Sequence, residues 1–417
     1  MNGERVTLPY VFHILLVSVL LAPVPAAAQE SPLDYPQWRG PARDGSAAAF
    51  VEPAEWPDAL TRQWRVDVGT GYGTPLIIGD RVYTFTRQDG DEVLSAVDTG
   101  TGRLVWSTRY PAPYRANAGT ERHGPGPKST PTFYEGTLFT LGISGIVSAF
   151  DTGDGTLLWQ HSASAVDPLY ATAMSPLAYD GNVVFHVGGH DAGALTAFDA
   201  RTGDITWQWD GDGPGYASPI LSTFDGTRQL VTITQEHVVG LSAATGELLW
   251  EREFVSNSTN NSITPIAYDD TIIVSGHNLG VTRFRPVSRD GQWDTDTIWE
   301  NQSVGLFMSN GVVVDDAFFS MSHTNSGQFF ALDIATGETL WSTQGREATN
   351  TALAKAGELL FLLNDDAELL VARASRVGFE PFRRYTMSDT VTWAQPAISG
   401  NRLFIKDDAT LALWTVD

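Results

Sequence analysis

An eleven-residue phrase that ends on tryptophan recurs along this chain. Full copies, such as AVDTGTGRLVW and AFDTGDGTLLW, close at Trp106, Trp159, Trp207 and Trp341, and a shorter copy, LSAATGELLW, closes at Trp250. Self-similarity at a period of roughly 40 to 50 residues, with strand-like segments between the copies, is typical of a radial repeat in which no unit buries its apolar face alone. The repeat therefore predicts a β-propeller that forms one large domain.

A second repeat lies between the tryptophans. A Thr/Ser-Pro pair opens a strand, a turn of Gly, Asp or Asn follows, and a second apolar strand comes after it, as in TPLIIGDRVYTF. Eight copies, some of them degenerate, begin at Thr74, Thr130, Ser175, Ser218, Thr264, Ser309, Thr351 and Gln395. Each copy has the form of a hairpin, and a third strand and the tryptophan strand complete the unit. The chain is thus predicted to be all-β, with eight four-stranded antiparallel blades.

The outermost strand of the last blade is predicted to come from the start of the repeat region. Segment 63–68, QWRVDV, precedes the first Thr-Pro strand, whereas the last unit, from Gln395 to Asp417, has only three strands. Pairing 63–68 with this unit would close the ring and leave no open interior edge. We expect an eight-bladed propeller over 61–417, with 29–60 as an N-terminal extension that packs on it.

The repeated Asp, Gly and Trp are interpreted as structural. Asp98 and its equivalents can accept backbone N–H bonds in the turn between the third and fourth strands, and Gly102 and its equivalents supply the positive φ that such a turn demands. The tryptophan would lie flat between neighbouring blades with its N–H on a carbonyl. Because these aspartates are expected far from the axis, we do not interpret them as metal ligands.

Charge and the N-terminus restrict the location and the partners. Lys and Arg number 26 against 49 Asp and Glu, and the formal charge of −23 would repel phosphate backbones, which excludes nucleic acid as an expected partner.

Residues 1–28 have the pattern of a cleaved signal peptide, with an apolar run at 14–21 and small residues at 26–28. The chain has no cysteine, hence no lipid-accepting or thiolate site. We expect a periplasmic or secreted protein with no membrane insertion after cleavage.

The A-x-D-x-x-T-G-x-x-x-W phrase resembles the tryptophan-docking repeat of the pyrroloquinoline-quinone (PQQ) propellers, which include quinoprotein alcohol dehydrogenases and BamB-type outer-membrane assembly factors. The segments QWRGPARDG, from Gln37, and GPGPKSTP, from Gly124, look like parts of secreted bacterial PQQ-like repeat proteins. The resemblance covers about residues 61–417 and implies the propeller scaffold.

Two functions follow from this resemblance. One is a BamB-like, non-enzymatic binding scaffold with a protein partner in the cell envelope. The other is an oxidoreductase that uses PQQ with calcium, or another quinone. Quinoprotein dehydrogenases generally carry an adjacent-cysteine disulfide and hold calcium with Glu, Asn and Asp, and no segment of this chain aligns to those features. We therefore favour the scaffold over the enzyme.

A binding site is predicted at the mouth of the central channel. The residue three before each Pro position of the Thr/Ser-Pro repeat should ring this mouth, and these positions hold Tyr72, Lys128, Ala173, Tyr216, Ser262, Phe307, Thr349 and Trp393. Aromatic rings with one lysine can stack a flat anionic ligand, such as a quinone carboxylate. The alternative is that the rings plug a narrow eight-bladed channel or pack under the long loop from Ala112 to Lys128.

Two loops add candidates to the mouth. Loop 112–128, the largest interruption of the repeat, concentrates Arg115, Asn117, Glu121, Arg122, His123 and Lys128. Segment 257–261, NSTNN, enters the fifth blade from the same face and ends at Asn261. The full candidate set is Tyr72, Lys128, Tyr216, Phe307, Trp393, Arg122, His123 and Asn261. His186, His190 and Asp191 lie close in sequence but on strand and turn positions that need not converge, so no metal site is predicted.

Overall fold

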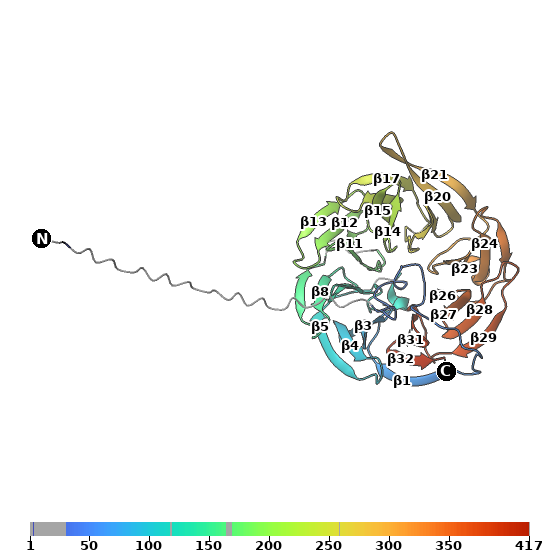
Figure 1. The fold of residues 1–417 in the computed structure, drawn as a ribbon, viewed down its shortest axis with the longest axis horizontal. Helices are drawn as coiled ribbons and strands as arrows, with labels where there is room; N and C mark the ends of the chain where they lie inside the picture. Colours follow the sequence, from blue (N-terminus) through green and yellow to red (C-terminus); the bar gives the residue numbers. More distant parts are fainter. Residues whose placement is uncertain (1–2, 4–30, 117–118, 164–168, 258, 417) are drawn as a thin grey trace.

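The strand-forming repeats build a ring of eight four-stranded antiparallel blades in the computed structural model (Figure 1). The structure describes residues 3, 31–116, 119–163, 169–257 and 259–416. Within these residues, helix is confined to two 3-10 turns, η1 (Glu121–His123) and η2 (Thr324–Ser326). The predicted all-β, eight-bladed propeller is confirmed. The predicted signal peptide lies outside the described residues, apart from Gly3.

The blades follow one another in chain order, each built from an inner strand to an outer strand. Blades 1 to 4 are β2 (Leu76–Ile78), β3 (Arg81–Gln88), β4 (Asp91–Asp98) and β5 (Leu104–Pro111); β6 (Thr132–Tyr134), β7 (Thr137–Leu141), β8 (Val147–Asp151) and β9 (Leu157–His161); β10 (Leu177–Tyr179), β11 (Asn182–Gly189), β12 (Ala192–Asp199) and β13 (Ile205–Trp209); and β14 (Ile220–Phe224), β15 (Thr227–Ile233), β16 (His237–Ser242) and β17 (Leu248–Glu253). Blades 5 to 8 are β18 (Ile266–Tyr268), β19 (Thr271–Ser275), β20 (Val281–Arg289) and β21 (Gln292–Asn301); β22 (Val312–Val314), β23 (Ala317–Ser322), β24 (Gln328–Asp333) and β25 (Thr339–Ser342); β26 (Thr351–Ala356), β27 (Leu359–Asn364), β28 (Glu368–Arg373) and β29 (Pro381–Thr386); and β30 (Ala397–Ser399), β31 (Arg402–Lys406), β32 (Thr410–Thr415) and β1 (Thr61–Asp67).

The two ends of the chain close the ring in blade 8. Strand β1 pairs antiparallel with β32, with Thr61 opposite Thr415 and Asp67 opposite Thr410. The strand was expected at 63–68, and the observed strand begins two residues earlier. This pairing confirms the predicted closure, and Figure 1 shows β1 beside the C-terminal strands at the rim.

The tryptophan phrase joins each blade to the next. In the turn after β4, Asp98 Oδ1 accepts the N–H of Thr101 at 2.8 Å, and Gly102 has a φ of 71°. The indole of Trp64, from blade 8, lies against Gly102 and donates its N–H to Thr99 O at 2.9 Å. Five tryptophans donate to a carbonyl of the following blade at 2.7 to 3.1 Å: Trp64, Trp106, Trp159, Trp299 and Trp341. Trp250 differs, since its N–H bonds Gln229 Oε1 of its own blade.

The Thr/Ser-Pro repeat forms a second, inner belt. The N–H of Thr74 donates to Thr130 Oγ1, that of Thr130 to Ser175 Oγ, and that of Ser175 to Ser218 Oγ, each at 2.9 Å. In blade 5 the N–H of Thr264 bonds an amide oxygen at 2.8 Å instead. The hydroxyl at each of these buried positions therefore accepts the backbone N–H of the equivalent residue in the preceding blade. This bond explains why the repeat opens with Thr or Ser.

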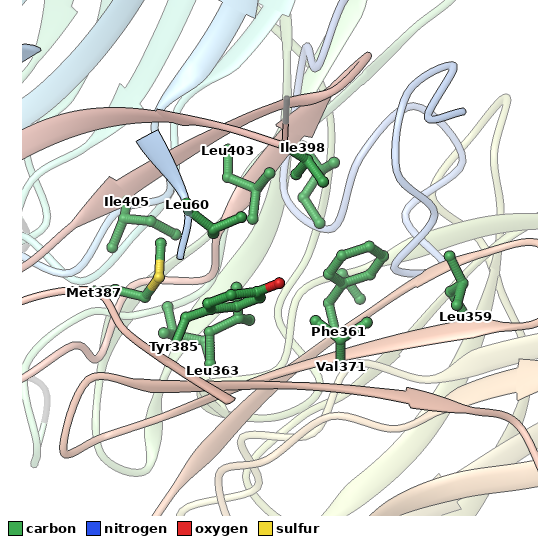
Figure 2. Close-up of a cluster of buried hydrophobic side chains, with 13 residues drawn as sticks. Leu60, Leu359, Phe361, Leu363, Val371, Tyr385, Met387, Ile398, Leu403 and Ile405 are labelled. Atoms are coloured by element: carbon green, nitrogen blue, oxygen red, sulfur yellow. The ribbon is translucent and has the colours of Figure 1, made fainter. Parts of the chain in front are cut away.

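The core lies between the blades. The buried side chains of the described residues form eight clusters, one at each interface between neighbouring blades. Figure 2 shows the cluster between blades 7 and 8, where Leu60 of the extension packs with Phe361, Tyr385 and Ile405. Each blade therefore depends on both neighbours for burial, as expected for a radial repeat.

The N-terminal extension crosses one end of the channel, where its blue trace lies at the centre of the ring (Figure 1). Tyr35 exchanges two backbone bonds with Ile77 of β2, at 2.8 and 3.1 Å. The buried Arg39 side chain donates to Gly311 O at 2.5 Å, and the Trp38 indole donates to Thr264 Oγ1 at 2.9 Å. The chain itself therefore fills part of this end of the channel. In the described part of the chain, no helix has the length and apolar character that a membrane span requires.

Candidate functional site

The loops that enter the inner strands meet at the other end of the channel and surround a cavity of about 380 Å³. Its described lining residues are Trp38, Tyr72, Gly119, Thr120, His123, Lys128, Tyr170, Ala173, Tyr216, Ser218, Asn260, Ser262, His277, Phe307, Met308, Asn310, Asn350 and Trp393. The structure brings together six of the eight candidate residues: Tyr72, His123, Lys128, Tyr216, Phe307 and Trp393. We call this cavity the mouth pocket.

One wall of the mouth pocket is an aromatic cluster with a lysine. The ring of Trp393 lies 6.0 Å from that of Tyr72 and 5.0 Å from that of His123, the latter edge to face. Lys128 Nζ lies 5.9 Å from the centre of the Tyr72 ring, within cation–π distance. Burial lowers the pKa of Lys128 to about 8. This wall therefore combines flat apolar faces with one cation that titrates near neutral pH.

A second wall holds His277, which the sequence analysis did not select. His323 contacts His277 but is not among the described lining residues. His277 lies 4.5 Å from the ring of Phe307 and 4.8 Å from that of His323. Burial, and then the charge of His323, lowers the pKa of His277. Both histidines occupy the turn between the second and third strands of neighbouring blades, at almost the same distance from the Thr/Ser-Pro position. That shared offset is the sequence signal that could have identified them.

Two tyrosines form the third side. The backbone N–H of Tyr170 donates to the Tyr216 hydroxyl at 2.9 Å, and the two rings lie 5.9 Å apart. Burial raises the pKa of Tyr216, so its hydroxyl stays neutral. The floor includes Trp38, which the extension inserts from the opposite end. Sequence reasoning missed Trp38 because nothing local places residues 31–60 inside the channel.

Asn261 does not line the mouth pocket, contrary to its place in the candidate set. Its side chain is buried, and its Nδ2 donates to the carbonyls of Thr234, Gln235 and Phe254 at 3.0 Å each. An amide that satisfies three loop carbonyls is a structural tie between blades 4 and 5. Its neighbours on either side face the pocket instead.

Loop 112–128 contributes to the pocket only in part. His123, at the end of η1, faces Trp393, whereas Arg122 is described only by its position in η1. Asn117 lies outside the described residues. The histidines on blade 3 do not converge, because His186 Nε2 bonds Asp212 O at 3.2 Å while His190 lies 3.4 Å from Asp191 Oδ1.

The chemistry of the lining fits a flat anion better than a metal. None of the described lining residues is Asp or Glu, and their neutral side-chain oxygens belong to the amides of three asparagines and to hydroxyl groups. Calcium prefers several oxygen ligands that include carboxylates. Elsewhere in the described chain, no group of three or more His, Cys, Asp or Glu could hold a metal ion. The described lining of the pocket therefore presents rings, hydroxyls, amides and Lys128, but no set of carboxylates that would hold calcium.

An eight-bladed ring with these repeats and an aromatic mouth defines a PQQ-like β-propeller. A family model described as outer membrane protein assembly factor BamB matches residues 58–191, 167–343 and 288–409. The chain belongs to this BamB-type family of PQQ-like propellers.

Similar proteins include assembly factors and subunits of quinone dehydrogenases. The outer membrane protein assembly factor BamB of Burkholderia pseudomallei (strain K96243) is 25% identical over 343 residues, which cover 73% of this chain and 85% of that protein. The dehydrogenase subunit of the quinone alcohol dehydrogenase of Komagataeibacter europaeus is 28% identical over 164 residues, 36% of this chain. The match spans 21% of that subunit.

Solved structures share the fold with both groups. BamB from Moraxella catarrhalis aligns with a TM-score of 0.61 and 17% identity, covering 86% of this chain and 100% of that one. Quinohemoprotein alcohol dehydrogenase from Comamonas testosteroni aligns with a TM-score of 0.66 and 15% identity, covering 94% and 81%. At such identities the likeness concerns the fold alone.

Proposed function

We propose that this protein is an exported, non-enzymatic binding scaffold of the cell envelope that works with a protein partner of outer-membrane assembly. The proposal rests on the match to the assembly-factor family model along residues 58–409. It also rests on the similarity to BamB of Burkholderia pseudomallei, of which the match covers 85%. The sequence match to the quinone dehydrogenase subunit covers only 36% of this chain and 21% of that subunit.

The lining of the mouth pocket also favours a binding role. The quinone chemistry of the dehydrogenases in this family would need a calcium ion and a carboxylate base at the mouth. The described lining has no carboxylate that could bind the calcium ion or act as the base. The described lining residues do not fit PQQ with calcium, and we derive no redox step. The aromatic wall and Lys128 would suit a flat anionic molecule or a partner side chain of that character.

The partnership is tested by isolation from the native host. A tagged, full-length copy at native expression level should bring down subunits of the outer-membrane assembly machinery from detergent-solubilised envelopes. The same tag on an unrelated exported protein is the control. Isolation of the tagged chain without any assembly subunit would contradict the partnership.

The competing activity is tested separately. Purified protein incubated with PQQ, calcium, an alcohol and an artificial electron-accepting dye should reduce no dye above the level without protein. Sustained turnover in this assay would replace the scaffold with the dehydrogenase.

A further inference from the structure

The extension docks in the channel by pairing with the open edges of inner strands. In a hairpin with a two-residue turn, the two residues that flank the turn form backbone hydrogen bonds with each other. On the first strand, the residue that precedes this pair therefore points its N–H and C=O away from the second strand. Ile77 is such a residue, and both of its backbone groups bond Tyr35. The inner strands therefore present a ring of backbone donors and acceptors toward the axis.

The extension occupies this ring on one side only. Besides Ile77, it bonds Phe133 N–H in blade 2 at 2.8 Å and Ile398 O in blade 8 at 2.9 Å. In blade 7 it bonds both backbone groups of Lys355, at 2.8 Å each. The Lys355 side chain then donates to Val313 O in blade 6 at 2.9 Å. Blades 6, 7, 8, 1 and 2 are thus covered.

Blades 3, 4 and 5 are left open. The equivalent residues of blades 3 and 5 are Ala178 and Ala267, and in the longer hairpin of blade 4 Leu221 has the same orientation two residues further from the turn. The described residues give the backbone groups of these three residues no hydrogen-bond partner toward the axis. A groove of about 470 Å³ lies along these strands. Ala267 is exposed, and Ala178 and Leu221 are half-buried. We call this the inner-edge groove.

The floor of the inner-edge groove carries positive charge without a paired anion. Arg43 lines it, is 5% exposed, and donates to Ser175 O, Pro176 O and Gln37 Oε1 at 2.9 to 3.1 Å. The fully buried Arg39 beside it also donates only to carbonyls. Every hydrogen bond from the two guanidinium groups thus ends on a neutral oxygen, and Arg43 Nε is buried without a partner.

The acids near the groove are already neutralised. Asp44 pairs with Lys355 at 2.9 Å, and Asp180 pairs with Arg228. Burial, and then the nearby charge of Arg39, lowers the pKa of Arg43 to about 9, as expected where positive charges are crowded. A carboxylate entering the groove would meet uncompensated positive charge.

We propose that the inner-edge groove docks an extended segment of a partner protein that carries a carboxylate. The backbone of the segment would add to the open edges of β10, β14 and β18, as the extension does on β2, β26 and β30, and its carboxylate would face Arg43. This inference rests on the proposed scaffold function and adds the surface and the chemistry of the partner. The groove lies at the opposite end of the channel from the mouth pocket.

The test uses the intact protein and two fluorescein-labelled octapeptides of alternating threonine and valine. The peptides differ only in an aspartate or a lysine at the fourth position. We expect the acidic peptide to bind with micromolar affinity in fluorescence anisotropy, and the lysine peptide at least tenfold more weakly. Absence of binding, or equal binding of the two peptides, would overturn the proposal.

A matched pair of variants tests the strand edge. Ala267→Pro removes one edge N–H without touching the internal ladder, whereas Ala267→Ser keeps it at the same exposed position. We expect the proline variant to bind the acidic peptide at least fivefold more weakly and the serine variant within twofold of wild type. Unchanged binding by Ala267→Pro would overturn the docking mode.

If a variant does not fold, backbone hydrogen exchange of the wild-type protein, measured with and without the acidic peptide, tests the same docking site. The acidic peptide should slow exchange in 177–179, 220–224 and 266–268, and unchanged exchange there would overturn the proposal. Selective peptide binding without co-isolated assembly subunits would reject only the assembly partnership. Co-isolated subunits without selective peptide binding would reject only the groove.

Discussion

Gly155 lies against the indole ring of Trp106, so close that a Cβ built on Gly155 would fall 2.5 Å from Cε3 of that ring. The same residue has a φ of 75°, which side chains rarely adopt. Glycine is thus required twice, by the turn and by the tryptophan of the preceding blade. This relation repeats at Gly102, Gly203, Gly246 and Gly337, each against the tryptophan of the preceding blade.

We predict that Gly155→Ala lowers the free energy of unfolding by about 3 kcal/mol or more, because it adds a clash with a confined ring to the strain of a positive φ. Gly136→Ala is the matched control, since Gly136 has a φ of 82° with no atom within 4 Å of its built Cβ. That variant should lose only about 1 kcal/mol. Urea unfolding measures the free energy of unfolding of both variants. Equal losses of stability in the two variants would show that the packing of Gly155 against Trp106 does not contribute to stability.

The belt of hydroxyls at the channel wall makes a second prediction. Thr130 is fully buried, and its Oγ1 accepts the N–H of Thr74. Thr130→Val should cost about 1 to 3 kcal/mol, because it leaves that buried N–H without an acceptor. Thr130→Ser keeps the hydroxyl and should cost less than the valine variant, although it loses a methyl group. If denaturant unfolding ranks the two variants the other way, the belt is not a stabilising feature.

The blades could be predicted from the sequence because their determinants are local and repeated. The turn of Asp98 and Gly102 closes within a few residues, and eight copies of the Thr/Ser-Pro pair reinforce one another. Ring closure was also predictable, because the last repeat unit has only three strands and the strand around Trp64 precedes the first unit. Five of the six candidates that meet at the mouth do so because their positions follow from the repeat, and the sixth, His123, comes from the long loop 112–128.

The rest depended on contacts between residues far apart in the chain. Trp38 bonds a hydroxyl 226 residues away, and Arg39 bonds a carbonyl 272 residues away. No local pattern encodes such pairings. Asn261 was misassigned because position along a loop does not determine on which side of the loop a side chain lies. His277 was missed because it lies in the turn between β19 and β20, outside the Thr/Ser-Pro positions and the two loops from which candidates were drawn.

The pH dependence of stability should report His186. Burial lowers the pKa of this histidine to about 4, from about 6.5 in the unfolded chain. Below pH 6.5 the unfolded state binds a proton that the folded state does not, so stability falls between pH 6.5 and 4, by up to about 3 kcal/mol. His186→Gln should remove this component, and His190→Gln, at a more exposed site, should not. Parallel losses in all three proteins on acidification would assign the effect to other groups.

The mouth pocket should bind anions in a pH-dependent way through Lys128. The lysine is charged at pH 7 and loses its proton as the pH rises through about 8, so the affinity for a flat anion should fall above that pH. PQQ without calcium is the probe, and quenching of tryptophan fluorescence measures its binding. We expect the dissociation constant to rise about fivefold to tenfold between pH 7 and 9.5.

Lys128→Met keeps the apolar stem and removes the charge, so this variant should bind the probe weakly and with little dependence on pH. Trp393→Leu provides a contrasting case, because it removes a stacking face and leaves the lysine in place. It should weaken binding at every pH and keep the wild-type slope. If the methionine variant retains that slope, another group governs the titration and Lys128 does not face the ligand.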